Sequence, residues 1–189
     1  MLSSHCFLKE EKMNNREVWD AVNADGELLG YDLFRDEAER IPHGVYHIVP
    51  EVITITDKGR ILLTQRDPAK PYGCKWEFTC GSALKGESAL QAAARELQEE
   101  TGIYAENHQF HALKCLTLRN SLYYIYLCKV KEEGLQIYLQ PGETVDHRFI
   151  TAAELPLVVR NDSFAEPVRE RFEIYADSLF ACINAINDG

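Results

Sequence analysis

The sequence predicts a mixed α/β fold, a sandwich in which helices pack on a sheet of mixed strand direction. Short β-branched runs bounded by turn signals predict strands in both halves of the chain. One strongly amphipathic helix interrupts the strands, and a second long amphipathic segment follows them near the end. The elements lack the regular β-α-β rhythm of a doubly wound sheet, so a mixed sheet fits better. The length of 189 residues suits one domain with short extensions.

The N-terminal half begins with polar residues of mixed charge at 1–14, which we expect to form a flexible arm before a single domain over residues 15–189. Turn sequences at 23–26 and 57–59, each ending in glycine, predict connections between adjacent strands. The expected strands of this half span residues 17–22, 28–31, 45–56, 60–65 and 76–79. A short helix is expected at 34–40 and a loop with proline and glycine at 70–74.

The clearest helix runs from about Ser88 to Thr101. Ser88 and Gln91 fit a capping box, and Gly102 fits a left-handed C-terminal cap. The helical period predicts a stripe that packs on the sheet, made of Leu90, Ala93, Ala94 and Leu97. Further strands are expected at residues 111–118, 121–131, 135–139 and 144–150, then a one-turn helix at 152–155 and a longer helix at 165–186.

The formal net charge of −10 disfavours polyanionic partners such as a nucleic acid polymer or an anionic membrane. It is compatible with a small phosphorylated substrate, because a local cluster of basic residues or a metal ion can override the overall sign. No apolar run reaches the ~18–20 residues that span a bilayer, and residues 1–12 lack the apolar core of a secretion signal, so we expect a cytoplasmic protein. The six scattered cysteines lack zinc-ligand spacing and are expected to be free thiols.

Three glutamates form an acidic face on the clearest helix. Glu96, Glu99 and Glu100 follow the i, i+3, i+4 spacing, so their carboxylates lie on one side. Like charges at this spacing destabilise an isolated helix by roughly 0.2–0.5 kcal/mol per pair, at the helix end where the dipole disfavours anions. Taken alone, such a face is typical of a solvated helix surface. A metal site is the alternative, since Mg²⁺ binds carboxylate oxygens and leaves positions for water and phosphate.

The residues around these glutamates follow a longer pattern. Gly81 is followed after five residues by Glu87, and after seven more by a continuous segment. That segment is Arg95-Glu96-Leu97-Gln98-Glu99-Glu100-Thr101-Gly102-Ile103. From average residue usage, a chance match to the whole pattern in this chain is on the order of one in ten million. Residues 81–103 resemble the Nudix box, G-x5-E-x7-R-E-U-x-E-E-x-G-U with U apolar, at every fixed position.

The resemblance to the Nudix hydrolases implies a fold and a reaction. The implied fold is an α/β/α sandwich around a mixed sheet, here with an N-terminal β extension, and family habit implies a homodimer. The implied reaction is hydrolysis of a diphosphate bond in a nucleoside diphosphate-linked substrate or a nucleoside triphosphate, with Mg²⁺ or else Mn²⁺ as cofactor. The implied metal ligands are Glu96, Glu99, Glu100 and the backbone carbonyl of Gly81. The implied catalytic set is Glu99, Glu100, Arg95 and Glu143, and Arg95 would pair with Glu87 to brace the loop before the helix.

Residues outside the box are less specific. Nudix hydrolases often take a further carboxylate from elsewhere as base or ligand, and Glu143 is the first choice here, with Asp146 in reserve. Arg66 and Lys70 flank the loop opposite the box and could hold phosphate oxygens. The aromatic candidates for stacking on a base are Tyr72 and Trp76. For Glu143, Arg66 and Lys70 a role in the solvated surface is an equally simple interpretation, and for Tyr72 and Trp76 a role in the core is the more common one.

The stretch from about residue 17 to 155 resembles a Nudix branch that includes type I isopentenyl-diphosphate isomerase. Cys80 occupies the place of that enzyme's catalytic cysteine, and His47 the place of a metal-binding histidine. Against isomerisation, Ser82 replaces a second histidine, residues 118–124 offer no carboxylate, and the box is complete. We therefore interpret Cys80 as a packed thiol and His47 as structural, and rank a hydrolase above an isomerase. The third alternative is a non-catalytic nucleotide-sensing Nudix module, which the complete box disfavours.

Overall fold

The computed structural model describes residues 16–187, so the arm predicted at residues 1–14 lies outside the described part. The strands of this part are β1 (Val18–Val22), β2 (Leu28–Phe34), β3 (His47–Thr56), β4 (Arg60–Arg66), β5 (Trp76–Glu77), β6 (Thr79–Cys80), β7 (Phe110–Leu118), β8 (Ser121–Val130) and β9 (Thr144–Thr151). The helices are α2 (Ala89–Thr101), α3 (Leu155–Val159) and α4 (Glu166–Asn187), with 3-10 turns η1 (Arg35–Arg40) and η2 (Asn107–Gln109). Among these residues, none of the helices has the length and apolar character to cross a membrane.

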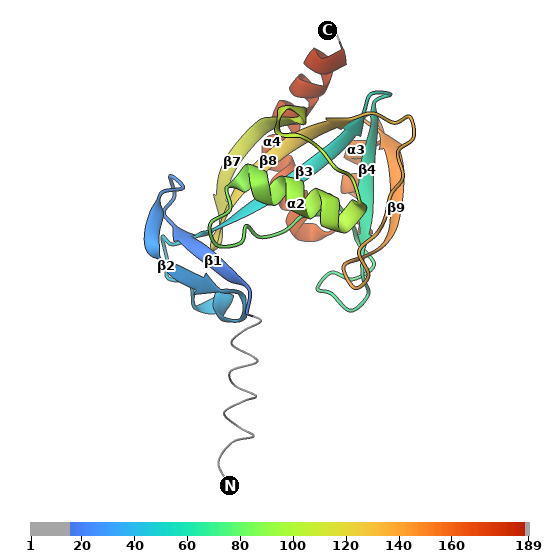
Figure 1. The fold of residues 1–189 in the computed structure, drawn as a ribbon. Coiled ribbons are helices and arrows are strands. Elements are labelled where there is room, and N and C mark those ends of the chain that lie inside the picture. The colour runs from blue at the N-terminus through green and yellow to red at the C-terminus, as the bar shows by residue number, and fades with distance from the viewer. Residues whose placement is uncertain (1–15, 188–189) are drawn as a thin grey trace.

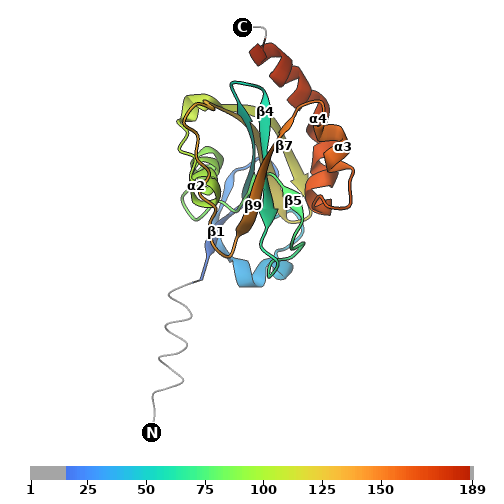
Figure 2. The ribbon, with the colours of Figure 1, turned by 90° about the vertical axis from the view of Figure 1, so that its right-hand side faces the viewer.

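Seven of the strands form one mixed sheet, while β1 and β2 form a separate antiparallel pair. The neighbours β3 and β8 run parallel, from His47 opposite Ser121 to Thr56 opposite Val130, and the other pairings in the sheet are antiparallel. The order across the sheet is β5-β4-β3-β8-β7, with β9 beside β4 and β6 beside β3. Helix α2 covers one face, and α3 and α4 cover the other (Figure 1 and Figure 2). The predicted α/β/α sandwich with a mixed sheet is confirmed.

Each face of the sheet has its own apolar core, because successive side chains of a strand point to opposite faces. On β3, the buried Ile53 and Ile55 pack with Phe172 of α4 on one face. Val52 points to the other face and packs with Leu97 of α2. Burying a side chain such as Leu97 contributes roughly 1.5–3 kcal/mol. This packing fixes the rotation of α2, and with it the direction of the acidic face.

The N-terminal β extension is the β1–β2 hairpin, which lies at one end of the sandwich (Figure 1). An isolated bridge between Val22 and Tyr46 joins it to the start of β3. The indole of Trp19, 3% exposed, stacks on His47 of β3, with ring centroids 4.0 Å apart and planes 13° apart. Its Nε1 donates a hydrogen bond to Glu17 at 2.8 Å. The hairpin is therefore docked by specific contacts that bring its ends to the start of β3.

The prediction of a strand at residues 135–139 is wrong, because this segment has no regular secondary structure. Backbone N–H groups of this segment and of Gln140 donate hydrogen bonds to carbonyl groups at the C-terminal end of α2 instead. The Tyr138 N–H donates to the Thr101 carbonyl at 2.8 Å, and the Gln140 N–H donates to the Glu100 carbonyl at 3.4 Å. The last carbonyls of a helix have no partner within the helix, so a neighbouring chain segment can satisfy them.

Other elements also differ from expectation in their bounds, among them the strand expected at residues 28–31, which extends to Phe34 as β2. The helix expected at residues 152–155 begins only where that range ends, as α3, with Pro156 in its first turn where proline is tolerated. The strand expected at residues 76–79 is divided at Phe78. Its first part pairs with β4 and its second part with β3, because the chain crosses from one neighbour to the other.

Candidate active site

The local signals predicted for α2 are confirmed. Ser88 is the N-cap, and both hydrogen bonds of its capping box with Gln91 are present. Gly102 ends the helix in the left-handed region, with φ of 73°. The predicted stripe lies in one core, with Ala93 and Leu97 buried and Leu90 and Ala94 half-buried. With that stripe on the sheet, the adjacent face with the three glutamates lies toward the N-terminal hairpin and β4.

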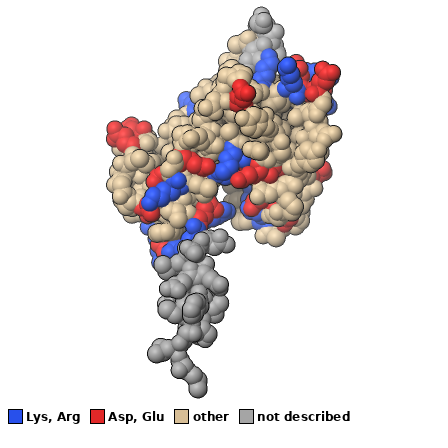
Figure 3. Space-filling view, in the orientation of Figure 1, with Lys and Arg blue, Asp and Glu red and all other residues tan. Residues whose placement is uncertain are grey.

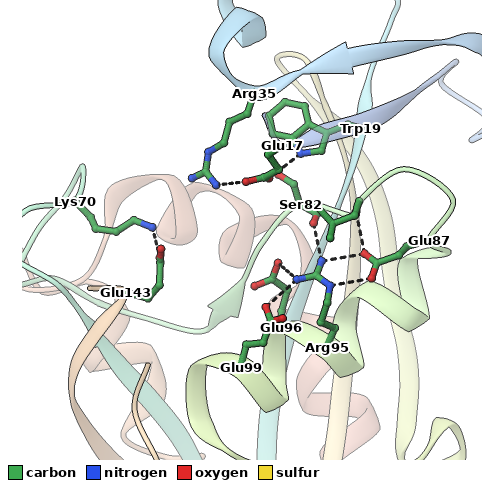
Figure 4. A network of polar contacts seen from close by, with 11 residues as sticks. Glu17, Trp19, Arg35, Lys70, Ser82, Glu87, Arg95, Glu96, Glu99 and Glu143 are labelled. Carbon is green, nitrogen blue, oxygen red and sulfur yellow. Dashed lines mark hydrogen bonds and ion pairs between the residues drawn. The ribbon is translucent and has the colours of Figure 1, made fainter. Parts of the chain in front are cut away.

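The guanidinium group of Arg95 binds three glutamates of the box, Glu87, Glu96 and Glu99 (Figure 4). Its Nε and Nη2 donate to the two carboxylate oxygens of Glu87 at 2.8 and 2.9 Å, a bidentate pair that is stronger than a single hydrogen bond. Its Nη1 donates to Glu96 at 2.8 Å and to Glu99 at 3.0 Å, and Nη2 also donates to the Ser82 carbonyl at 3.0 Å. The structure thus brings Arg95 and Glu87 together and ties the loop before α2 to the helix.

Gly81 and Glu100 form the inner part of the site. The carboxylate of Glu96 lies against Gly81, where a Cβ atom would come within 3.0 Å of the carboxylate atoms. Glu100 is 6% exposed, and its Oε2 has no hydrogen-bond partner among the described residues. Burial, together with the carboxylates of Glu77 and Glu96, raises the pKa of Glu100 well above its ordinary value. An ionised carboxylate buried here needs a positive charge beside it.

These features fit a divalent cation. In the structure Arg95 is the positive charge that faces Glu96 and Glu99, and among residues 16–187 no three histidine, cysteine or acidic side chains meet closely enough to share an ion. Carboxylate and carbonyl oxygens are nevertheless the ligands of a hard cation such as Mg²⁺. The unpartnered Glu100 oxygen supplies a free lone pair, and the absence of a side chain at Gly81 lets the Glu96 carboxylate lie against the Gly81 backbone. The residues that would hold the cation are Gly81, Glu96, Glu99 and Glu100.

The opposite wall of the site carries two ion pairs. Arg66 Nη1 donates to Glu77 Oε2 at 2.6 Å, and Lys70 Nζ pairs with the Glu143 carboxylate (Figure 4). Glu77 is 5% exposed, and burial, opposed by Arg66, raises its pKa to about 7. Each basic side chain predicted to hold phosphate therefore lies beside a carboxylate. Glu77 was not predicted, although a lone charge within the apolar run 76–79 was a usable signal.

Between these walls lies a cleft of about 460 Å³. Basic and acidic side chains gather around a hollow between the hairpin and the rest of the molecule (Figure 3). The predicted residues that line the cleft are Gly81, Arg95, Glu96, Glu99, Glu100, Arg66, Lys70 and Glu143. Glu17 and Arg35 line it as well, joined by a hydrogen bond of 2.5 Å from Arg35 Nη1 to Glu17 Oε2. These two residues were not predicted as site residues, because local patterns do not show where a hairpin docks.

Cys80 and His47, the residues shared with the isomerase, line the same cleft. His47 is 6% exposed, its Nε2 lies 2.9 Å from Ser121 Oγ, and burial lowers its pKa to about 4. Burial raises the pKa of the Cys80 thiol, so the thiol is neutral at neutral pH. Residues 118–124 contribute Ser121 and Tyr123 to the cleft, and no carboxylate. The cysteines of the described part, Cys74, Cys80, Cys115, Cys128 and Cys182, are free thiols.

Three weaker candidates do not line the cleft. Asp146 is exposed on β9, where its carboxylate accepts the backbone N–H of His147 at 2.8 Å. Trp76 is half-buried, with the Arg148 guanidinium 4.2 Å from its ring centroid. Tyr72 is exposed on the loop between β4 and β5 and lines a separate, smaller pocket. Of these three residues, only Tyr72 has an exposed aromatic ring that lines a pocket.

Comparison with known proteins identifies the family. The NUDIX domain family model matches residues 45–172. An uncharacterized Nudix hydrolase of Listeria monocytogenes is 31% identical over 150 residues, which cover 78% of this chain and 88% of the relative. The chain therefore belongs to the Nudix hydrolases, enzymes that act on phosphorus-containing anhydrides. The hairpin that contributes Glu17 to the cleft lies outside the matched residues.

Other similarities bear on the reaction and the fold. An NAD-capped RNA hydrolase of Pseudomonas putida, NudC, is 26% identical over 135 residues, 71% of this chain and 47% of the relative. An isopentenyl-diphosphate Delta-isomerase of Serratia proteamaculans is 34% identical over 95 residues, 49% of this chain and 51% of the relative. The crystal structure of DR0079 from Deinococcus radiodurans superimposes with a TM-score of 0.65 at 17% identity, over 84% of this chain and 99% of that chain. This last similarity shows the fold alone.

Proposed function

We propose that this chain is a Mg²⁺-dependent hydrolase that cleaves a diphosphate bond by attack of water at phosphorus. The substrate is a nucleoside diphosphate linked to a further moiety, or a nucleoside triphosphate. The observation that carries the proposal is one cleft that combines the box glutamates with Arg66 and Lys70 on the facing wall. The relative named for NAD-capped RNA supports a nucleoside diphosphate linkage, since NAD contains one. The net charge of −10 favours a small phosphorylated substrate over a nucleic acid polymer.

The residues of the cleft have separable roles in this reaction. A bound Mg²⁺, or Mn²⁺ in its place, supplies positive charge that neutralises phosphate oxygens, and the three box glutamates with the Gly81 carbonyl hold it. Arg66 and Lys70 hold further phosphate oxygens by charge-assisted hydrogen bonds. Lys70 would exchange its carboxylate partner for phosphate when substrate binds, whereas Arg66 would keep its bond to Glu77 through Nη1. The substrate phosphates are thereby oriented for attack along one direction.

Glu143 acts on the attacking water, and Arg95 orients the glutamates that hold the metal ion. Glu143 is released when Lys70 turns to a phosphate oxygen, and its carboxylate then accepts a proton from the attacking water. Arg95 stays bound to Glu87 and orients Glu96, so that the acidic face keeps its shape while the substrate changes. Arg95 is thus a positioning residue, although its guanidinium also lies in the wall of the cleft.

An isomerase is the second candidate, and the relative from Serratia is the observation that favours it. Cys80 would then protonate a double bond and leave the diphosphate intact. The neutral, buried thiol agrees with a proton donor, but Ser82 replaces a histidine and residues 118–124 contribute no carboxylate to the cleft. A sensor without turnover is the third candidate, and the complete box counts against it.

A substrate panel tests the proposal and separates the candidates. The purified chain with Mg²⁺ is incubated with nucleoside triphosphates, dinucleotide diphosphates, nucleotide sugars and ADP-ribose, and phosphate-containing products are separated by chromatography. Release of nucleoside monophosphate or of inorganic diphosphate is expected from at least one compound. No product from any of them, with tight binding of one, would instead support the sensor. Interconversion of isopentenyl and dimethylallyl diphosphate that disappears in Cys80→Ala would support the isomerase.

A further inference from the structure

A second pocket, of about 190 Å³, adjoins the cleft. Arg66 and Cys80 line both spaces, so these two side chains form the boundary between them. The pocket opens between the loop that joins β4 to β5 and the first turn of α4, which contributes Pro167 and Val168. Pockets that enclose a whole drug-sized ligand measure roughly 300–1,000 Å³. The smaller volume here suits one part of a molecule whose remainder lies in the cleft.

The lining of this pocket combines apolar and charged side chains. The apolar part consists of Pro71, Tyr72, Ala165, Pro167 and Val168. The polar part consists of Arg66, Glu77 and Arg171. Arg171 is 3% exposed and pairs with the fully buried Glu51, and Arg66 pairs with Glu77 at 2.6 Å. The charged side chains of the lining therefore offer guanidinium donors and a carboxylate acceptor to a group in the pocket.

The loop presents Tyr72 in an uncommon backbone conformation. Tyr72 and Cys74 have φ of 60° and 63°, a region that non-glycine residues adopt only when the surroundings enforce it. Arg66 enforces it here. Its Nε donates to the Pro71 carbonyl at 2.8 Å, and its carbonyl accepts the Cys74 N–H at 3.1 Å. Such conformations concentrate at ligand-binding sites, and here the result is an aromatic ring, 47% exposed, at the mouth of a pocket.

We propose that this pocket binds the nucleobase of the substrate, with the base against the ring of Tyr72 and its polar edge toward Arg66 and Arg171. The proposal rests on the proposed function, because it places the phosphates of the same nucleotide in the adjoining cleft. Every base has a flat face that stacks on an aromatic ring and an edge with hydrogen-bond acceptors. The ring of Tyr72 and the guanidinium donors of Arg66 and Arg171 match these two properties.

A hydrocarbon chain is the other ligand that the apolar part of the lining could accept, and the charged part disfavours it. Arg66, Glu77 and Arg171 would then face a group without donors or acceptors, and covering charged groups with hydrocarbon costs free energy. A base replaces the lost water with hydrogen bonds. The charged side chains of the lining therefore favour a nucleotide over a prenyl diphosphate in this pocket.

The test compares two probes that differ by the base alone. Binding of AMP and of ribose 5-phosphate to the full chain is measured by titration calorimetry without added metal. AMP is expected to bind at least about fivefold more tightly, the lower end of what stacking one base on an aromatic ring contributes. Tyr72→Asn should abolish this difference, because asparagine tolerates the same backbone conformation but has no ring. Tyr72→Phe should keep it.

A matched control removes an exposed tyrosine elsewhere. Tyr104 is 74% exposed and lines neither the cleft nor this pocket, so Tyr104→Asn should leave both affinities unchanged. Equal binding of the two probes by the wild type, or an AMP preference that survives Tyr72→Asn, would overturn the proposal. Isopentenyl diphosphate binding more tightly than AMP would overturn it in favour of a hydrocarbon pocket. An AMP preference in a chain that hydrolyses nothing would leave the base pocket standing and refute the proposed function alone.

Discussion

Gly81 lies against the carboxylate of Glu96, so closely that no other amino acid can occupy position 81 without displacing that side chain. The contact joins the first residue of the Nudix box, in the loop after β6, to the middle of α2. Because Glu96 is also held by Arg95, its carboxylate is fixed from two sides. A glycine at the first position of the box is therefore required by space, since Gly81 does not have positive φ.

Gly81→Ala should lower kcat by about 100-fold, the loss typical of a displacement of roughly 1 Å at a reacting centre. The melting temperature should change little, because the new methyl group displaces a side chain at the cleft and not the core. Gly44→Ala is the control: no atom lies within 4 Å of the added Cβ, but φ is +84°. That variant should lose about 1–2 kcal/mol of stability and keep its kcat. A normal kcat in Gly81→Ala, or a loss of kcat in Gly44→Ala, would contradict the steric explanation.

Arg95→Lys should lower kcat at least tenfold although the charge is kept. Lysine cannot form the bidentate pair with Glu87 and hold Glu96 and Glu99 at the same time. The measurement is steady-state kinetics on the substrate found in the panel. Arg60→Lys changes an exposed pair with Glu132 outside the cleft and should leave kcat within twofold. Equal kinetics in the two lysine variants would show that Arg95 is dispensable for positioning.

Arg35→Gln should raise KM about tenfold with little change in kcat. The guanidinium lines the cleft and is oriented by Glu17, so we expect it to contact a phosphate beyond the reacting one, and such a contact is worth about 1.5–3 kcal/mol. Lys85→Gln removes a salt bridge to Asp32 on the same hairpin, outside the cleft, and is the matched control. A KM that rises equally in both variants would indicate a displaced hairpin and not a lost substrate contact.

The stability of the protein should fall between about pH 6.5 and pH 4 through His47. Burial lowers the folded-state pKa of this imidazole to about 4, with Glu17 and Arg35 as the charges nearest to it. Between the two pKa values the unfolded chain binds a proton that the folded chain does not, so acid favours unfolding by up to about 3 kcal/mol. His47→Gln should lack this component. Urea unfolding of the wild type and of His47→Gln at pH 7 and pH 4.5 measures this loss of stability. An equal loss in the two proteins would contradict the assignment to His47.

The sequence predicted the elements whose signals are local. Ser88, Gln91 and Gly102 bound α2 because capping depends on a few adjacent residues, and the spacing of the box places Glu96, Glu99 and Glu100 on one face. The prediction of a strand at residues 135–139 was wrong because it also depended on a local pattern alone. The backbone of this segment bonds to the end of α2, a partner far away in sequence that no local pattern identifies.

Contacts between distant segments account for what was missed at the site. Arg35 and Glu17 reach the cleft because Trp19 stacks on His47, and the ion pair of Arg66 with Glu77 depends on the pairing of β4 with β5. The residues predicted by resemblance to the box, by contrast, lie together because the family shares one loop-and-helix geometry. The homodimer and the cytoplasmic location stay predictions, since they depend on surfaces and surroundings beyond a single chain.

Glu100→Gln tests the central claim most directly. The variant and the wild type are compared for Mg²⁺-dependent hydrolysis of the panel substrate, with melting temperature as a second measurement. Turnover should fall by at least about 10³-fold, because a neutral amide cannot replace a buried carboxylate as ligand to a hard cation. The melting temperature should stay equal or rise, since Glu100 is buried with one oxygen unpartnered among the described residues. A near-normal rate in Glu100→Gln at saturating Mg²⁺ would contradict the metal site and the hydrolytic mechanism built on it.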